Sequence, residues 1–294
     1  MKEQELKNLI TNHINIDKKD VEVHFHSSNL FSLYKLISKK PINIKNKSFY
    51  QMAIKVIDNF QMALLEFESL QLLYNFHVRV PFPIDVLRTN DMNLLIMEFI
   101  DKTSISLAAK KDLIVSLKKL YSHRSLNYGF DKDNFIGTLI QKNSEYNNFL
   151  DFWWASRIEP MLSIAIENQY FSVNEKNDLF KIIKKFLSDW NLEKDQPRAI
   201  HGDLWSGNIL FSNEFAYLID PSFAYSHPVQ DFAMLELFGS PLNFSDYLDI
   251  ANYCNFSIKP EMIEFFQIYP LLVHVNIFGI TYKREVLKFI QKFK

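Results

Sequence analysis

The sequence predicts an α+β protein of two lobes, a small N-terminal lobe around an antiparallel sheet and a larger, mainly helical C-terminal lobe. Two observations carry this prediction. Apolar runs typical of strands lie at 52–57 and 93–100, with a helical pattern between them. In the second half, apolar residues recur at helical spacing, as in 179–190. We expect the N-terminal lobe to span residues 1–98 and the C-terminal lobe 99–294.

A short motif in the second half predicts the chemistry. Asp203 and Asn208 stand at the Asp-x-x-x-x-Asn spacing of the catalytic loop of protein kinases. The segment 209–219 has the pattern of a hairpin that returns the chain to this loop, so we expect Asp220 beside Asn208. Asp203 can then face an attacking hydroxyl, while Asn208 and Asp220 offer oxygen ligands for Mg²⁺ against the phosphates of ATP. The two-lobed fold is therefore expected to be protein-kinase-like.

The first half contains residues that can hold those phosphates. Lys55 lies in the apolar run 52–57, close to the Val-Ala-Ile-Lys pattern of a kinase. Glu66 and Glu68 lie on the helix that follows, and because successive residues point about 100° apart, only one of them can face the lysine. We choose Glu66, which neighbours Leu65 on the buried side, with Glu68 as the alternative.

The run 93–100 is expected to be a buried strand that leads out of the first lobe. In a kinase-like fold the backbone just past this strand binds adenine, so we place the hinge at 97–101 and take Met97 and Phe99 as nucleotide contacts.

A second segment, 148–158, is predicted to be a helix that Pro160 ends or kinks. Trp153 on this helix is either a wall of the substrate cleft or a core residue. Arg157, one turn later, is then expected to be solvated or in a salt bridge.

The block at 201–208, His-Gly-Asp-Leu-Trp-Ser-Gly-Asn, contains a Trp-Ser pair that most aminoglycoside and choline kinases lack. Three further blocks accompany it, at 128–143, 152–160 and 226–234. Together they resemble the fructosamine kinase (ketosamine-3-kinase) family, a branch of the aminoglycoside phosphotransferase and choline kinase group. The resemblance runs, with gaps, from about Lys55 to about Met234.

This resemblance implies an ATP- and Mg²⁺-dependent kinase that phosphorylates the 3-hydroxyl of ketoamines, namely fructosamine or ribulosamine adducts of amines or protein lysines. The product releases its amine, so the activity would be deglycation repair. Asp203 would be the base, and Trp205 would offer a flat face to the sugar or fill the core. His201 and Asp231 would brace the catalytic loop.

The segment before the lysine strand departs from the family pattern, because 23–30 contains no glycine where the family usually has several. We expect Ser27 and Ser28 to supply the turn and the donors to phosphate, without the positive-φ freedom of glycine. This loop supports one alternative, a pseudokinase that binds a partner or a nucleotide without turnover. The other alternative is a different small-molecule kinase of the same fold, of the aminoglycoside or choline type.

The composition limits the possible partners. The chain has 294 residues, 48% of them hydrophobic, and a net charge of −1, which argues against nucleic acid or an anionic membrane as the main partner. Cys254 is the one cysteine, so a disulfide framework is excluded and a cytoplasmic protein is expected. The first residues lack the apolar core of a signal peptide, and the polar residues within 265–282 favour a buried helix over a membrane span. The sequence does not set an oligomeric state.

Overall fold

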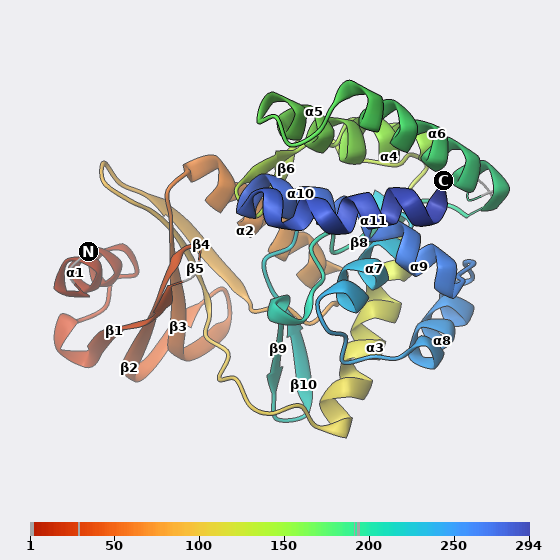
Figure 1. Ribbon diagram of the computed structural model, residues 1–294. Helices are drawn as coiled ribbons and strands as arrows, with labels where there is room; N and C mark the ends of the chain where they lie inside the picture. The colour runs from red at the N-terminus through yellow and green to blue at the C-terminus, as the bar shows by residue number, and fades with distance from the viewer. Residues whose placement is uncertain (1–2, 29, 191, 193–194) are drawn as a thin grey trace.

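The computed structural model describes residues 3–28, 30–190, 192 and 195–294, and it confirms the predicted α+β architecture (Figure 1). A five-stranded sheet forms the N-terminal part, in the order β1-β2-β3-β5-β4, with every neighbouring pair antiparallel. The strands are β1 (Val21–Ser28), β2 (Ser32–Ile44), β3 (Lys47–Ile57), β4 (Pro83–Arg88) and β5 (Asn93–Glu98).

Two helices cover the sheet, α1 (Glu3–His13) on one face and α2 (Phe60–Asn75) on the other. Side chains of β3 alternate between these faces, as in any strand. Met52 and Ile54 therefore join the core with α1, whereas Ala53 and Ile57 join the core with α2. The core on the α2 face continues into the helical part of the molecule, so this face looks toward the C-terminal part.

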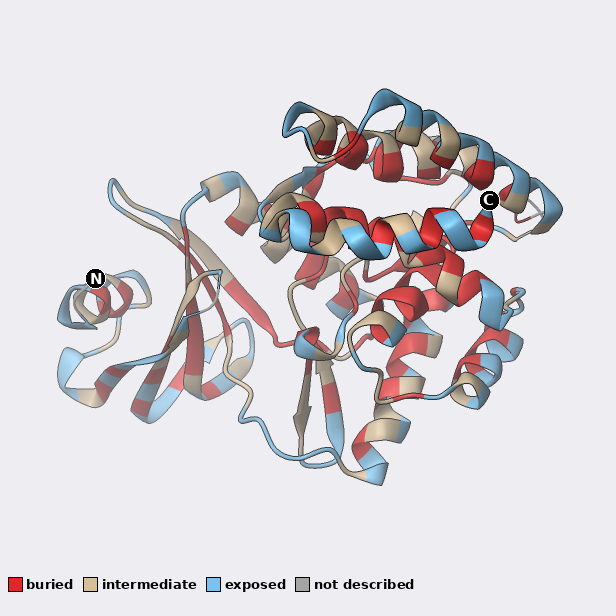
Figure 2. Cartoon of the chain, in the orientation of Figure 1, coloured by how far each residue is buried: buried red, intermediate tan, exposed pale blue. Residues whose placement is uncertain are grey.

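The C-terminal part is mainly helical, and Figure 2 shows buried residues on the inner sides of its helices and exposed residues on the outer sides. The described helices are α3 (Leu107–Ser122), α4 (Phe149–Trp153), α5 (Glu159–Glu167), α6 (Val173–Trp190), α7 (Val229–Leu237), α8 (Phe244–Cys254), α9 (Pro260–Phe266), α10 (Ile268–Phe278) and α11 (Lys283–Phe293). Three small antiparallel pairs lie among them: β6 (Asn134–Ile136) with β7 (Leu139–Gln141), β8 (Arg198–Ile200) with β11 (Ala224–Ser226), and β9 (Ile209–Ser212) with β10 (Phe215–Leu218).

The helical stretch around Pro160 is longer than the sequence predicts. A π-helical turn, η2 (Trp154–Ile158), joins α4 to α5, so the helix passes through the proline instead of ending there. Pro160 has no N–H for the carbonyl of Ser156, four residues earlier. The guanidinium of Arg157 donates to that carbonyl at 3.0 Å and satisfies it.

The apolar segment 265–282 is divided among the end of α9, all of α10 and the 3-10 turn η5 (Ile280–Tyr282). Most of α10 is buried in the helical part, which confirms that this segment belongs to the core. Within the described ranges, no helix combines the length and the apolar character that crossing a membrane requires.

Candidate active site

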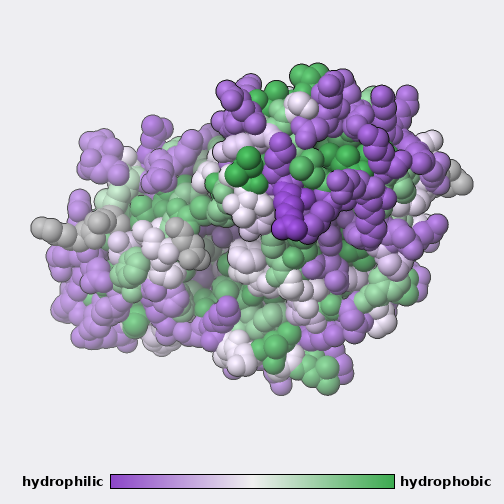
Figure 3. Space-filling model, in the orientation of Figure 1, coloured by the Kyte–Doolittle hydropathy of each residue, from purple (hydrophilic) through white to green (hydrophobic). Residues whose placement is uncertain are grey.

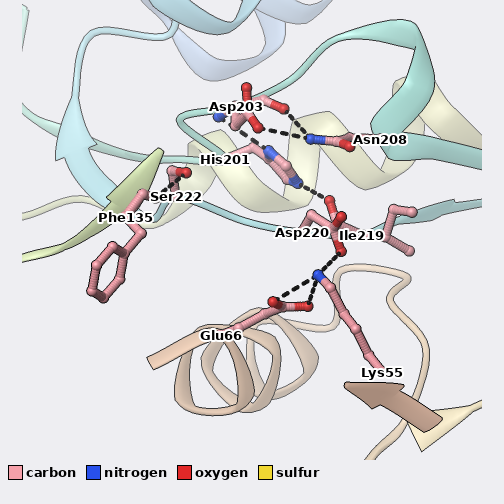
Figure 4. A network of polar contacts seen from close by, with 9 residues as sticks. All are labelled: Lys55, Glu66, Phe135, His201, Asp203, Asn208, Ile219, Asp220 and Ser222. Carbon is pink, nitrogen blue, oxygen red and sulfur yellow. Dashed lines mark hydrogen bonds and ion pairs between the residues drawn. The ribbon is translucent and has the colours of Figure 1, made fainter. Parts of the chain in front are cut away.

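Three charged side chains from distant parts of the chain meet on the α2 face of the sheet (Figure 4). Lys55 on β3 donates to both carboxylate oxygens of Glu66 on α2 at 2.8 Å. It also donates to Oδ1 of Asp220 at 3.0 Å. Glu68, the alternative partner, instead pairs with Lys132 at 2.9 Å. The lysine is thereby held in a fixed position at the boundary between sheet and helices.

Electrostatics distinguish the two carboxylates of this triangle. Burial alone would lower the pKa of Lys55, but Asp220 and Glu66 raise it above its ordinary value. Burial raises the pKa of Glu66 to about 7, against the attraction of Lys55. Burial would also raise the pKa of Asp220, yet the Lys55 ammonium outweighs burial and lowers it. Asp220 therefore stays ionised, and its side chain is 39% exposed, whereas that of Glu66 is only 10% exposed.

Asp203 and Asn208 lie on the loop before β9 and contact each other. The Nδ2 group of Asn208 donates to the carbonyl oxygen of Asp203 at 2.8 Å and to its Oδ2 at 3.0 Å. Both amide hydrogens are thus used, which leaves the amide oxygen of Asn208 as its group for a ligand. Burial, and then the negative charge of Asp220, raise the pKa of Asp203 to about 7.

The β9–β10 hairpin brings Asp220 to this loop, as the sequence predicts. The backbone N–H of Ile219 donates to the carbonyl of Asn208 at 3.0 Å, directly after β10. The turn of the hairpin uses Asn213 at φ 53°, a conformation that Asn tolerates better than most residues. Asp220 itself has φ 55°. The hairpin therefore explains how a residue twelve positions after Asn208 returns to its side.

Buried hydrogen bonds fix the start of the 201–208 loop. Asp231 on α7 accepts from the backbone N–H groups of His201 and Gly202, both at 2.8 Å, and from the hydroxyl of Tyr121 at 3.1 Å. Gly202 has φ +83°, and a Cβ there would lie 2.0 Å from the carbonyl oxygen of Ser222. No other residue fits this turn without moving the backbone after Asp220.

The side chain of His201 supports the loop from within. Its Nδ1 accepts from the N–H of Asp203 at 3.3 Å, so Nε2 carries the proton and donates to the carbonyl of Ile219 at 3.0 Å. Burial lowers the pKa of His201 to about 4, which keeps the ring neutral. His201 thus links the residues next to Asp203 and Asp220.

The two tryptophans singled out in the sequence have different surroundings. Trp205 is 40% exposed, and its ring lies against Gly207, where a Cβ would come within 2.1 Å of the indole. It is therefore not a core residue. Trp153 is completely buried, with its ring centroid 4.5 Å from that of Phe266, so of its two expected roles it has that of a core residue and not that of a cleft wall. The apolar face of α4 packs on α9, so Trp153 on that face is buried between the two helices.

Arg157 also differs from expectation, because it is neither solvated nor paired with a carboxylate among the residues described. The residue is 2% exposed, and its guanidinium donates to the carbonyl of Lys142 at 2.6 Å and to Oδ1 of Asn143 at 2.8 Å. Burial lowers its pKa to about 10.

Arg157 is one end of a buried polar network that sequence reasoning missed. Oδ1 of Asn134 accepts from Gln141 and from Asn143, both at 2.8 Å, and Gln141 also donates to the carbonyl of Ser222 at 3.1 Å. The hydroxyl of Tyr269 donates to Gln141 at 2.7 Å. The signal available in the sequence was the cluster of amides in an otherwise apolar block. Being buried, these groups support the strand after Asp220 and do not face the cleft.

The expected nucleotide contacts lie along the end of β5 and the tip of β1. Met97 is buried on the α2 face, and Phe99 follows the strand. The ring of His26 meets Phe99 edge to face at 5.1 Å. A β-bulge between Phe25 and Ser27 leaves His26 out of the strand register and turns it toward this hinge. Nothing in the sequence indicates the bulge, so His26 was missed.

The end of β1 and the start of β2 lie near the buried triangle. Ser28 pairs with Ser32 across the turn, and no partner for the hydroxyls of Ser27 and Ser28 is found among the described residues. The ammonium of Lys55 lies 5.2 Å from the centroid of the Phe31 ring. Phe31 therefore approaches Lys55 through its side chain. Figure 3 shows a recess between the sheet and the helical part on the face in view.

The oxygen atoms of this site suit magnesium. Asn208 offers an amide oxygen and Asp220 an ionised carboxylate, both hard ligands of the kind Mg²⁺ prefers. Within the described part of the chain, no three His, Cys, Asp or Glu side chains cluster as a metal cage. Phosphate oxygens and water would therefore have to complete the coordination.

Known proteins resemble this chain over most of its length. The family model for fructosamine kinase matches residues 35–294. A probable ketoamine kinase from Enterococcus faecium is 31% identical over 246 residues, which cover 82% of this chain and 86% of that protein. A fructosamine-3-kinase-like crystal structure from Haemophilus somnus has a TM-score of 0.79 at 16% identity, covering 98% of this chain and 96% of the other. An ADP-bound aminoglycoside phosphotransferase has a TM-score of 0.59 at 18% identity, with 98% and 96% covered. These two structures share the fold.

Proposed function

Because the chain belongs to the fructosamine kinase family, we propose that it transfers phosphate from ATP to the 3-hydroxyl of ketoamines in the cytoplasm. The substrates would be fructosamine or ribulosamine adducts of amines or protein lysines, and loss of the phosphorylated sugar would repair the amine. One observation carries this proposal, namely that Lys55, Asp220 and the Asp203–Asn208 pair meet at one site. The similarity to a probable ketoamine kinase supports the substrate class.

In the proposed reaction the two parts of the molecule bind different substrates. Residues 1–98 would bind the nucleotide, with Met97 and Phe99 at the adenine and Ser27 and Ser28 at the phosphates. Residues 99–294 would bind the sugar and carry the base. The ADP-bound relative of the same fold supports nucleotide binding by this architecture.

At the phosphates, Lys55 would donate to the α- and β-phosphate oxygens while Glu66 holds it in place. Asn208 and Asp220 would hold Mg²⁺, which neutralises phosphate charge when bound. The exposed carboxylate of Asp220 faces this side, since Lys55 takes only one of its oxygens.

At the sugar, Asp203 would orient the 3-hydroxyl and accept its proton. A pKa of about 7 places this carboxyl between its acid and base forms at neutral pH, which suits a general base. Trp205 would offer its exposed indole face to the sugar ring. His201 and Asp231 act through the loop and touch no substrate, because both are buried.

A pseudokinase remains the second candidate, favoured by the glycine-free β1–β2 turn and the Phe31 ring beside Lys55. In that case the site would bind nucleotide without turnover.

The direct test is magnesium-dependent ADP release from ATP with ribulose-lysine, erythrulose-lysine and fructose-lysine, and with kanamycin and choline as controls. Turnover on a ketoamine alone is the expected result. Turnover only on kanamycin or choline would move the protein to another kinase class of the same fold. Bound ATP with no turnover on any compound would favour the pseudokinase.

A further inference from the structure

A second cavity, of about 400 Å³, lies between α2 and the loop that precedes β6. We call it the α2 groove and define it by Leu65, Glu68, Ser69 and Leu72 of α2, and by Phe130 and Tyr225 opposite them. The four helix residues follow the spacing of one helix face. Glu66 points instead to Lys55, so the groove and the phosphate site lie on different sides of the same helix.

Two hydroxyl groups line the groove without a partner. Ser69 is 6% exposed, and no hydrogen-bond partner for its hydroxyl exists among the residues described. Tyr225 is half-buried, and its hydroxyl also has no hydrogen-bond partner within the same ranges. Buried polar groups are normally hydrogen-bonded, and leaving one unsatisfied is costly. A ligand with a polar group would satisfy the buried hydroxyl of Ser69.

The charges around the groove favour a cation. Glu68, Asp131 and Glu145 line it and face one positive side chain, Lys132. Lys132 pairs with Glu68, and among the described residues Glu145 accepts a hydrogen bond only from the amide of Asn127, at 3.1 Å. Asp131 forms no hydrogen bond or ion pair in the described part of the chain. The carboxylates therefore exceed the cations by two.

The remaining surface of the groove is apolar. Leu65 and Leu72 contribute aliphatic side chains, and Phe130 and Tyr225 contribute rings. A fully hydrated inorganic cation would make no favourable contact with these apolar groups. A primary ammonium attached to a flat apolar group matches both the carboxylates and the apolar surface of the groove, because aromatic faces accept flat groups as well as cations.

We propose that the α2 groove binds a small organic amine, a primary ammonium on a flat apolar group, and that the bound amine holds α2 where Glu66 contacts Lys55. The ammonium would lie between Glu68 and Asp131, near the Ser69 hydroxyl, with the apolar body against Phe130. This site is separate from the cleft and does not depend on the identity of the phosphate acceptor.

Two connections couple the groove to the catalytic residues. One is α2 itself, which carries both Ser69 and Glu66. The other is Asn134, which lines the groove and donates to the carbonyl of Phe223 at 2.8 Å, close to Asp220 in the chain. The proposed coupling requires that ATP and the amine both favour the arrangement of α2 in which Glu66 contacts Lys55, in which case each ligand raises the affinity for the other by linkage.

The test uses benzylamine as the probe, with benzyl alcohol as its neutral isostere and benzoate as the anion, titrated into the full chain by calorimetry. We expect saturable binding of benzylamine alone and tighter binding in the presence of ATP and Mg²⁺. Equal affinity for benzyl alcohol, or no saturable binding of benzylamine, would overturn the site. Unchanged benzylamine affinity on adding ATP would overturn the coupling.

Variants locate the binding. Ser69→Leu fills the groove and removes a hydroxyl, so it should abolish benzylamine binding. Glu68→Gln should weaken it about tenfold, since one charge-assisted hydrogen bond is lost. The matched control is Glu264→Gln, because Glu264 on α9 forms a similarly exposed pair with Lys292 on α11, and this variant should bind benzylamine like the wild type. If Ser69→Leu does not fold, Glu68→Gln decides, and unchanged affinity in that variant contradicts the proposal.

Discussion

The proposed catalytic loop at 201–208 and the β1–β2 turn are held in place in opposite ways. The loop is fixed through its main chain, by Asp231 and by the ring of His201. The end of β1 and the residues before β2 contact their surroundings through side chains, His26 on Phe99 and Phe31 near Lys55. The comparison suggests that the loop requires a fixed geometry for chemistry, while the turn supplies nucleotide affinity. Changes in the loop should therefore reduce kcat, and changes in the turn should mainly alter KM for ATP.

The largest expected effect is that of Asp203→Ala on turnover. Loss of a general base should lower kcat by about 10²–10⁴. The measurement is steady-state ADP release with a ketoamine substrate. Asp249→Ala is the control, since Asp249 lies on α8 in an exposed pair with Lys118. Near-normal turnover by Asp203→Ala would remove Asp203 from the chemistry.

Asp231→Ala should affect both stability and turnover. It leaves two buried N–H groups, of His201 and Gly202, without an acceptor, which we expect to reduce the free energy of unfolding by about 3 kcal/mol. Urea unfolding measures this loss. Tyr121→Phe removes only the third donor to Asp231 and serves as the milder comparison. A fully stable and active Asp231→Ala would show that the loop needs no brace.

The pKa of Asp203 predicts a pH-dependent difference in stability. The folded pKa of about 7 exceeds the ordinary value of 3.8, so the folded state favours the protonated form. The contribution of the Asp203 carboxyl to the free energy of unfolding of the wild type is therefore fully present below pH 4 and is lost as pH rises through 7. Asp203→Asn should gain stability relative to wild type between pH 4 and pH 8, by up to ~2 kcal/mol because the side chain is partly exposed. Thermal unfolding at several pH values checks this, and a constant difference would contradict it.

The smallest expected effect is that of His26→Ala in the strand before the turn. Loss of an aromatic contact worth about 1 kcal/mol should raise KM for ATP roughly fivefold and leave kcat nearly unchanged. His24→Ala is the matched control, because His24 lies on the same strand and contacts Glu22 instead of the hinge. A tenfold loss of kcat in His26→Ala would mean that the turn takes part in chemistry, and the comparison would fail.

The same contrast explains what the sequence could predict. The helical pattern of α2 was enough to choose Glu66 over Glu68 as the partner of Lys55, because it placed Glu66 beside the buried Leu65. The hairpin pattern was enough to predict that Asp220 lies beside Asn208. These features follow from local periodicity. His26 depends on a bulge, and the burial of Trp153 and Arg157 depends on which face of α4 meets α9. The position of the bulge and the burial of these two side chains are determined by tertiary packing, which cannot be predicted from the periodicity of one sequence.

The most direct test of the account is the position of the transferred phosphate. Phosphorus and carbon NMR of the reaction of ATP, Mg²⁺ and ribulose-lysine should show a new phosphate ester on O3 of the sugar. The ester should be absent with Asp203→Ala or without Mg²⁺. Phosphate on another oxygen, or ATP that binds but never transfers its phosphate, would contradict the proposal that this cleft is a ketoamine 3-kinase.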